Sequence, residues 1–263
     1  MAPTIHVIRH AQAVHNATHN PELHDPELTE LGYQQCQELA AELASLGDVE
    51  LVFASPMQRS IQTGLAAFET YTQSKRIVLV PDVQETDLMP TGTGSSVHEL
   101  LSKYGDERLD FCFMSADWTD KSPQSRFAPH YAAVRARSTR LFLRAVAQRF
   151  RDTDANIVVI THLMFIDYLV GAGGTNFKNA ERRSYRFEQL VGDNIEARLV
   201  ETPCSIARRQ KAAAAPKPVL PNPFGVKIPS LDTHSEAFSI DNLPGMVPVT
   251  YEPTGVQPMS WYS

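Results

Sequence analysis

The feature that most constrains the fold is a regular alternation of short apolar segments with amphipathic ones. The apolar segments are four to six residues long, as buried strands are, and they occupy residues 4–9, 50–54, 77–80 and 157–161. Segments with helical spacing lie between them, at 29–46 and 131–151. Apolar strands that alternate with helices are typical of a parallel sheet covered on both faces. We therefore expect a three-layer α/β/α fold with a mainly parallel central sheet.

Local signals define several of the expected helices. Thr29 is the expected N-cap of the first long helix. Ser55 is expected to cap the next helix, with Pro56 at its first position, which is the placement that proline favours. The helix over 131–151 is expected to bury one face, made of Val134, Leu141, Ala145 and Phe150.

The remaining segments suggest how the domain is organised. Residues 88–130 are rich in Gly, Ser, Thr and Pro, and predict an irregular, lid-like insertion with a helical patch near 96–104. Residues 184–191 and 195–201 predict a hairpin that turns at 192–194. We expect one domain over 1–202. The proline-rich residues 203–263 are expected to form a tail that is extended, disordered or wrapped around the domain, and they do not reveal its role.

Composition and charge narrow the functional classes. Hydrophobic residues make up 43% and charged residues 21% of the 263, as in ordinary globular proteins. The three cysteines are scattered, so neither a disulfide framework nor a structural zinc site is expected. No signal peptide or transmembrane run is recognisable, which favours a cytoplasmic protein. The net charge of −6 argues against nucleic acid or a membrane as partner, and means that an anionic substrate needs a local basic pocket.

Polar side chains follow the ends of the predicted strands. His10 follows the strand 4–9, and His162 follows the strand 157–161. Arg59 comes shortly after the strand 50–54, and Glu85 after the strand 77–80. Ligands in open α/β sheets bind outside the carboxyl ends of the strands, so we expect these groups to meet at one edge.

This set of groups suits a phosphoryl group. The guanidinium groups of Arg9 and Arg59 offer planar forks of donors to phosphate oxygens. A neutral imidazole at His10 can attack phosphorus, while His162 can stabilise the transferring group. Glu85 can protonate the leaving oxygen and then activate water, and a carboxyl beside phosphate should have a raised pKa. The arrangement requires no metal and no cofactor.

Four segments together resemble one known family, the histidine phosphatase (phosphoglycerate mutase-like) superfamily. Arg9–Asn16 (RHAQAVHN) resembles its R-H-G-E-x-x-x-N signature, and His24–Gln35 (HDPELTELGYQQ) its D-x-x-L-T-x-x-G-x-x-Q segment. Ser55–Thr63 (SPMQRSIQT) is similar to its S-x-x-x-R-x-x-Q-T helix, and Thr161-His162 to a late S/T-H pair. The match runs in order from about residue 4 to 200. The form R-H-A-Q resembles a phosphatase-like branch found in plants and fungi.

The resemblance implies roles for individual residues. It implies that His10 is the phosphorylated nucleophile and that Arg9, Asn16, Arg59 and His162 bind phosphate. Glu85 matches the segment that holds the family's proton donor, with Asp87 as the fallback. The expected activity is hydrolysis of a small phosphate ester, either a monoester or a diphosphate, by a metal-independent phosphatase of the family's first branch.

Several alternatives stay open at the level of sequence. A phosphoglycerate-type mutase is one, although the segment 17–23 lacks the Trp that mutases carry there. A catalytically quiet phosphate-binding or interaction module is another, because Ala11, Gln12 and Leu163 depart from the family pattern. The sequence names neither the substrate nor the oligomeric state.

The histidines near the N-terminus also allow two interpretations. A metal cluster is one, but no H-E-x-x-H motif accompanies them. We prefer to place His15, His19 and His24 in a loop at the mouth of the pocket.

Overall fold

A seven-stranded mixed sheet forms the centre of the part of the chain that the structure describes. The computed structural model describes residues 2–188 and 197–214. The order of the strands is β4-β3-β2-β5-β1-β6-β7. Their bounds are Thr4–Arg9 (β1), Val49–Ala54 (β2), Ile77–Leu79 (β3), Leu109–Asp110 (β4), Asn156–Thr161 (β5), Arg182–Phe187 (β6) and Leu199–Glu201 (β7). The five strands from β4 to β1 pair in parallel, and β6 and β7 pair antiparallel at the other edge. The expectation of a mainly parallel sheet is confirmed.

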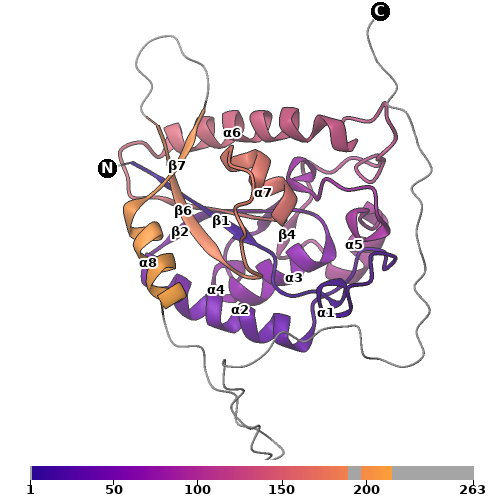
Figure 1. Ribbon diagram of the computed structural model, residues 1–263, viewed down its shortest axis with the longest axis horizontal. Coiled ribbons are helices and arrows are strands. Elements are labelled where there is room, and N and C mark those ends of the chain that lie inside the picture. The colour runs from indigo at the N-terminus through magenta and orange to yellow at the C-terminus, as the bar shows by residue number, and fades with distance from the viewer. Residues whose placement is uncertain (1, 189–196, 215–263) are drawn as a thin grey trace, which may run out of the picture. The chain divides into compact units, whose positions relative to one another are not determined.

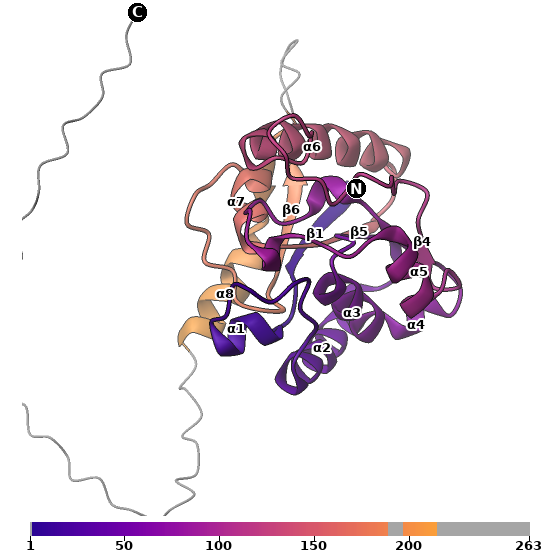
Figure 2. The same ribbon diagram turned by 90° about the vertical axis from the view of Figure 1, so that its right-hand side faces the viewer.

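Helices cover both faces of this sheet, which gives the three expected layers. In Figure 1, α6 runs along the top of the sheet and α2 along the bottom, and Figure 2 shows α7 beneath α6 and α3 beside α2. The bounds of the helices are Val14–Thr18 (α1), Glu30–Leu43 (α2), Gln58–Ala67 (α3), Glu69–Thr72 (α4), Val97–Tyr104 (α5), Ala132–Arg149 (α6), Leu163–Val170 (α7) and Pro203–Ala214 (α8).

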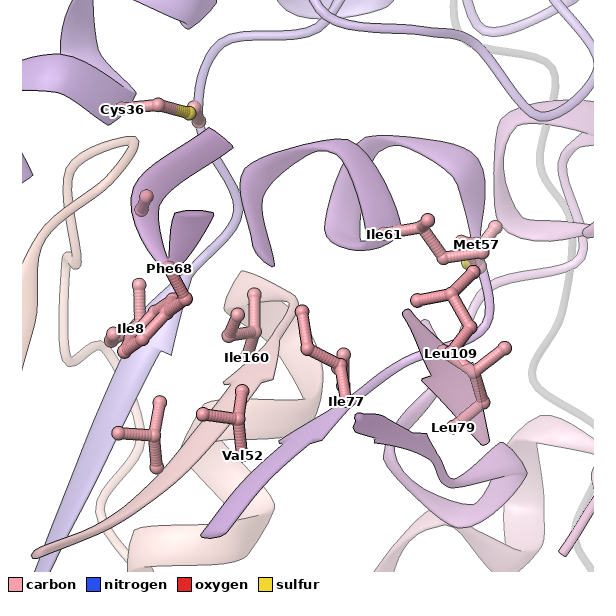
Figure 3. Close-up of a cluster of buried hydrophobic side chains, with 14 of the residues drawn as sticks. Ile8, Cys36, Val52, Met57, Ile61, Phe68, Ile77, Leu79, Leu109 and Ile160 are labelled. Atoms are coloured by element: carbon pink, nitrogen blue, oxygen red, sulfur yellow. The ribbon is translucent and has the colours of Figure 1, made fainter. Parts of the chain in front are cut away.

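Alternating side chains of the central strands fill two separate cores. Ile5 and Val7 of β1 pack with α6 and α7 on one face, whereas Ile8 packs with α2 and α3 on the other. Figure 3 shows the second core, where Ile160 of β5 and Ile61 of α3 lie between the sheet and the helix layer. Because successive side chains of a strand point to opposite faces, a strand buried on both faces is mostly apolar along its length.

The start of α3 differs from the sequence expectation. We predicted Ser55 as its N-cap and Pro56 as its first residue, but the helix begins at Gln58 and Met57 is its N-cap. The Ser55 hydroxyl group instead contacts Nε2 of His162 at 2.7 Å. A functional contact thus takes the side chain that local capping rules assign to the helix. By contrast, Thr29 caps α2 as predicted, accepting a hydrogen bond from the Gly32 amide.

A helix occupies the beginning of the segment that we expected to be an irregular tail. α8 starts immediately after Thr202, whose hydroxyl accepts a hydrogen bond from the Ser205 amide, and it contacts β6. It belongs to the same compact unit as the sheet. Its residues Ala207–Ala214 are almost all strong helix formers, a local propensity that outweighs the absence of an apolar stripe. Residues 215–263 lie outside the described part of the chain.

The buried face of α6 differs from prediction, because Val134 and Ala145 are exposed, whereas the predicted hairpin and the predicted helical patch are confirmed. β6 and β7 form the predicted antiparallel pair, while the predicted turn at 192–194 lies outside the described residues. Within the insertion 88–130, α5 matches the helical patch predicted near 96–104. In the two described ranges, no helix is long and apolar enough to cross a membrane.

Candidate active site

The register of three neighbouring strands brings the predicted residues to one edge of the sheet. Arg9 at the end of β1 pairs with Thr161 at the end of β5, so His10 and His162 leave the sheet side by side. β2 flanks β5 on its other side and leads through Ser55 to Arg59 on α3. The ring centroids of His10 and His162 are 5.2 Å apart. The two imidazoles that the sequence places about 150 residues apart therefore share one site.

The contacts of the His10 ring leave the lone pair of one ring nitrogen available for a reaction. Its ring is buried, and Nδ1 lies 2.7 Å from the carbonyl oxygen of Ala11. A carbonyl can only accept, so Nδ1 carries the proton and Nε2 of the neutral ring keeps its lone pair. Burial lowers the pKa of His10 well below its ordinary value, and the nearby charges of Arg59 and Arg9 act in the same direction. The ring is therefore neutral near pH 7, as a nucleophile must be.

His162 is also buried and neutral. Its Nε2 contacts the Ser55 hydroxyl at 2.7 Å and the Ser60 hydroxyl at 3.4 Å. Its Nδ1 is buried and has no hydrogen-bond partner among the described residues. Burial, followed by the charge of Arg59, keeps the pKa of His162 well below its ordinary value. A second imidazole nitrogen is thus left for a ligand.

Two guanidinium groups supply positive charge beside these rings. Arg59 is fully buried in the first turn of α3, and its Nη1 donates to the Thr91 carbonyl at 3.0 Å. Arg9 donates through Nη1 to the Phe177 carbonyl at 2.8 Å. In both residues Nε is buried without a partner in the described part of the chain. Each guanidinium is anchored by one bond and retains donors for an anion.

Glu85 is a buried carboxyl in the same electrostatic environment. Its Oε1 accepts a hydrogen bond from the Thr86 amide at 2.8 Å. Burial raises the pKa of Glu85, while the charge of Arg59 opposes that rise. The fallback acid, Asp87, is half-buried and accepts a bond from the Met89 amide at 2.9 Å. Burial and a raised pKa favour Glu85 over Asp87 as a proton donor.

Asn16 makes local contacts around the loop that follows His10. Its Oδ1 accepts hydrogen bonds from the Ala13 amide at 3.0 Å and from Nδ2 of Asn179 at 3.3 Å. Its own Nδ2 lies 2.9 Å from Nε2 of His15. The side chain therefore stabilises the turn, and one amide hydrogen remains for a ligand.

The segment His24–Gln35, the second of the motifs that resemble the family, supports the loop after His10. The Gln12 amide donates to Oε1 of Gln35, and the Thr29 hydroxyl donates to Oε1 of Gln12, both at 2.8 Å. Gly32 lets α2 approach closely, because a Cβ at this position would lie 2.2 Å from the Gln12 carbonyl oxygen. Gln12 thus connects the loop after His10 to Thr29 and Gln35.

The departures from the family pattern are accommodated by packing. Ala11 is completely buried in the core on the α2 side, and its amide donates to the Thr63 hydroxyl at 3.0 Å. Leu163 packs against the core on the α6 and α7 side. Both side chains therefore contribute to a core, which weakens the sequence-based reason for an inactive module.

The structure adds two charged residues that sequence reasoning did not assign to the site. Asp25 accepts bonds from the Gln58 amide at 3.0 Å and the Ser95 hydroxyl at 2.8 Å, and its charge acts on Arg59. Lys121, from the insertion, donates to the Glu85 carbonyl at 2.6 Å. Burial lowers the pKa of Lys121 to about 8. Asp25 lies within a resembling motif, whereas nothing periodic around Lys121 could have indicated its position.

The N-terminal histidines do not form a cluster. The His15 ring lies 5.9 Å from that of His10, whereas His19 and His24 are exposed. Among residues 2–188 and 197–214, no group of three or more His, Cys, Asp or Glu side chains could hold a metal ion.

Comparison with known proteins assigns the family. Residues 5–191 match the model of the histidine phosphatase superfamily, branch 1. The chain belongs to this superfamily. A phosphoglycerate mutase-like protein of Arabidopsis thaliana is 38% identical over 112 residues, which cover 38% of each chain. A probable phosphatase of Schizosaccharomyces pombe is 30% identical over 106 residues, covering 38% of this chain and 49% of the relative.

The comparisons also confirm the fold of this histidine phosphatase superfamily member. A solved structure described as mycobacterial hydrolase 1 is similar with a TM-score of 0.51 and 20% identity, over 76% of this chain and 96% of that one. The match with the curated relatives spans less than half of their length. Substrate and reaction are therefore matters for the proposal that follows.

Proposed function

We propose that this protein is a metal-independent phosphatase that hydrolyses a small phosphate ester, a monoester or a diphosphate, through a phosphohistidine at His10. Arg9, Arg59, Asn16 and His162 bind the transferring phosphoryl group, and Glu85 is the proton donor. The observation that carries the proposal is the bond from His10 Nδ1 to the Ala11 carbonyl, which leaves the Nε2 lone pair in a buried, cation-rich site.

In the first step, Nε2 of His10 attacks phosphorus. The P–N bond forms as the bond between phosphorus and the leaving oxygen breaks, and protonated Glu85 delivers its proton to that oxygen. Arg9 and Arg59 stabilise the negative charge on the equatorial oxygens, which is where charge accumulates during phosphoryl transfer. With the Ser55 hydroxyl donating to Nε2 of His162, Nδ1 carries the proton of the neutral ring and donates to these oxygens as a third contact.

In the second step, water attacks the phosphorus atom of the phosphohistidine. The Glu85 carboxylate takes a proton from the water, the P–N bond breaks and inorganic phosphate leaves. His10 and protonated Glu85 are thereby restored. The local charges of Arg9, Arg59 and Lys121 attract an anionic substrate to a protein whose net charge is −6.

The proposal predicts that the purified protein releases inorganic phosphate from an aryl phosphate in the presence of a chelator. The measurement is a phosphate-release assay with 4-nitrophenyl phosphate, with 3-phosphoglycerate as a second substrate. Conversion of 3-phosphoglycerate into 2-phosphoglycerate without phosphate release would instead identify a mutase. Phosphate binding with no turnover of any phosphorylated metabolite in a screen would identify a quiet module.

Replacing Glu85 by glutamine should separate substrates by their leaving groups. An alkyl phosphate needs a proton on its leaving oxygen, so we expect its kcat/KM to fall by about 10²–10³-fold in E85Q. A 4-nitrophenolate leaves without protonation, so the loss with that substrate should be smaller.

The same role determines a pH dependence for the wild-type protein. Because the protonated form of Glu85 is the active one, turnover of the alkyl substrate should fall as the pH rises through the raised pKa of this carboxyl. The descending limb should be absent in E85Q. If E85Q lost kcat/KM equally with the alkyl phosphate and with 4-nitrophenyl phosphate, another residue would be the proton donor. D87N, at the fallback acid Asp87, is the comparison variant.

The location of the protein is also a proposal. Cys36, Cys112 and Cys204 are all free thiols. Free thiols suit the reducing conditions of the cytoplasm, which we propose as the compartment.

A further inference from the structure

His15 occupies a position that the family motif leaves unspecified, yet it lies among the groups of the candidate active site. It belongs to α1, and its ring centroid is 5.9 Å from that of His10. The charges of Arg59 and Arg9 both lower the pKa of His15, and a charge on His15 would in turn lower the pKa of His162. Contacts with its neighbours then determine which of its ring nitrogens carries the proton.

The orientation of the Asn16 amide determines which of its atoms faces His15. A side-chain amide has nearly the same shape when its oxygen and nitrogen are exchanged, so the two atoms are assigned from their hydrogen-bond partners. The Ala13 amide, at 3.0 Å, can only donate, so the atom that faces it must be Oδ1 of Asn16. The donor Nδ2 of Asn179 contacts the same oxygen. The atom that faces His15 is therefore Nδ2, which can only donate.

The position of the proton then follows from the neutrality of the ring. Nε2 of His15 accepts the hydrogen bond from Asn16, so it has a lone pair and no proton. Burial, together with the charges of Arg59 and Arg9, lowers the pKa of His15 to about 4, and the ring is neutral near pH 7. A neutral ring has one N–H, which must be Nδ1–H.

This donor has no acceptor among the described residues. Nδ1 of His15 is buried and without a hydrogen-bond partner, as is Nδ1 of His162. A buried donor left unpaired is unfavourable, and native proteins normally avoid it. Such a donor beside two guanidinium groups and the proposed nucleophile is well placed for an oxygen of the substrate.

We propose that His15 is a substrate-binding residue whose Nδ1–H donates to an anionic oxygen of the phosphorylated ligand, and that Asn16 is the positioning residue that fixes this tautomer. The proposal rests on the proposed function and extends it to a residue outside the family motif. It also gives Asn16 a second role besides direct contact with phosphate. The ligand would accept hydrogen bonds from His15, His162 and the two arginines at once.

The tautomer can be observed without any turnover. Nitrogen-15 NMR of histidine-labelled full-length protein distinguishes Nδ1–H from Nε2–H, and the His15 signals are those missing from H15F. We expect the Nδ1–H form in the wild-type protein. In N16D the carboxylate can only accept, so the proton should move to Nε2. An Nε2–H ring in the wild-type protein would overturn the assignment.

Binding tests the role of the donor. H15F keeps an aromatic ring of similar shape but has no N–H, whereas H15Q restores a donor. Titration of inorganic phosphate should show binding about 10-fold or more weaker in H15F, because a hydrogen bond to a charged group is lost, with partial recovery in H15Q. The matched control is H24F at the exposed His24, which should bind phosphate as the wild type does.

The outcomes separate this inference from the function itself. If the wild-type protein hydrolyses aryl phosphate and H15F matches it in both KM and phosphate affinity, the role of His15 is wrong and the phosphatase stands. If phosphate binding weakens in H15F but the wild-type protein has no turnover, the site is supported and the phosphatase fails. A wild-type protein that binds no phosphate would overturn both.

Discussion

Replacing His10 by alanine is expected to reduce phosphate release by about 10⁴-fold or more, because the change removes the group that attacks phosphorus. The arginines and His162 remain, so binding of inorganic phosphate should fall far less than turnover. The measurement is kcat for 4-nitrophenyl phosphate, with phosphate affinity measured by titration on the same preparation.

H24A is the matched control for this replacement. His24 is exposed, whereas His10 is buried against the Ala11 carbonyl. We expect H24A to turn over substrate at the wild-type rate. Thermal unfolding of H10A should remain cooperative, which separates a loss of chemistry from a loss of fold. A kcat of H10A within tenfold of the wild type would contradict the role of His10.

Replacing Arg59 by methionine should have the second largest effect, on both activity and stability. A guanidinium group that stabilises a transferring phosphoryl group contributes about 10³-fold or more to the rate. Arg59 is also the buried cation whose charge acts on Glu85 and Asp25. Its loss removes the charge that opposes the raised pKa values of these carboxyls, so we expect the free energy of unfolding at neutral pH to fall by about 1–3 kcal/mol.

The pH dependence of that stability loss has a defined sign. Burial already raises the pKa of Glu85 and of Asp25, and Arg59 opposes both shifts. Without Arg59 the two folded-state values rise further above those of the unfolded chain. Stability contributed by such groups is present at low pH and is lost as the pH rises through the folded pKa. The deficit of R59M should therefore be larger at pH 8 than at pH 5.

Urea denaturation at the two pH values, together with kcat/KM, measures this prediction. R137M is the control, because Arg137 is an exposed residue of α6. We expect it to match the wild type in both properties. A loss of unfolding free energy in R59M that becomes smaller as the pH rises would contradict the proposed effect of the Arg59 charge on the buried carboxyls.

The sheet and most of the site could be predicted because their signals are local and coincide. The strands β1 and β5 are mostly apolar, and each ends directly before a histidine, His10 or His162. Parallel pairing then brings the two strand ends together, whatever the loops do. Arg59 reaches the same site because it lies in the first turn of α3, the helix that follows β2.

The features that were missed depend on tertiary contacts. We expected Val134 and Ala145 on the buried face of α6, but both are exposed, Val134 to 58%, and Arg135 is buried instead. The Arg135 guanidinium donates to the carbonyls of Asp82 and Gln84 and lies over the Phe165 ring, 5.2 Å from its centroid. Helical periodicity contains no information about neighbouring segments, and here the carbonyl oxygens of Asp82 and Gln84 accept hydrogen bonds from the buried guanidinium.

His15 illustrates the same limit at the site. Its sequence neighbours placed it in a loop, and that prediction gave no reason to separate it from His19 or His24. Only the short helix α1 and the contact with Asn16 distinguish it. Residues whose role depends on a neighbour's orientation carry no signal in spacing or composition.

The central claim is a covalent phosphohistidine, and alkaline quenching of a phosphoryl-labelled reaction, with acid treatment of a second sample, tests it most directly. We predict that protein quenched during turnover of a labelled phosphate ester carries base-stable, acid-labile phosphate on the peptide containing His10. The label should be absent from H10A. Turnover by the wild-type protein without any label on His10, under conditions that trap a phosphohistidine standard, would contradict the account.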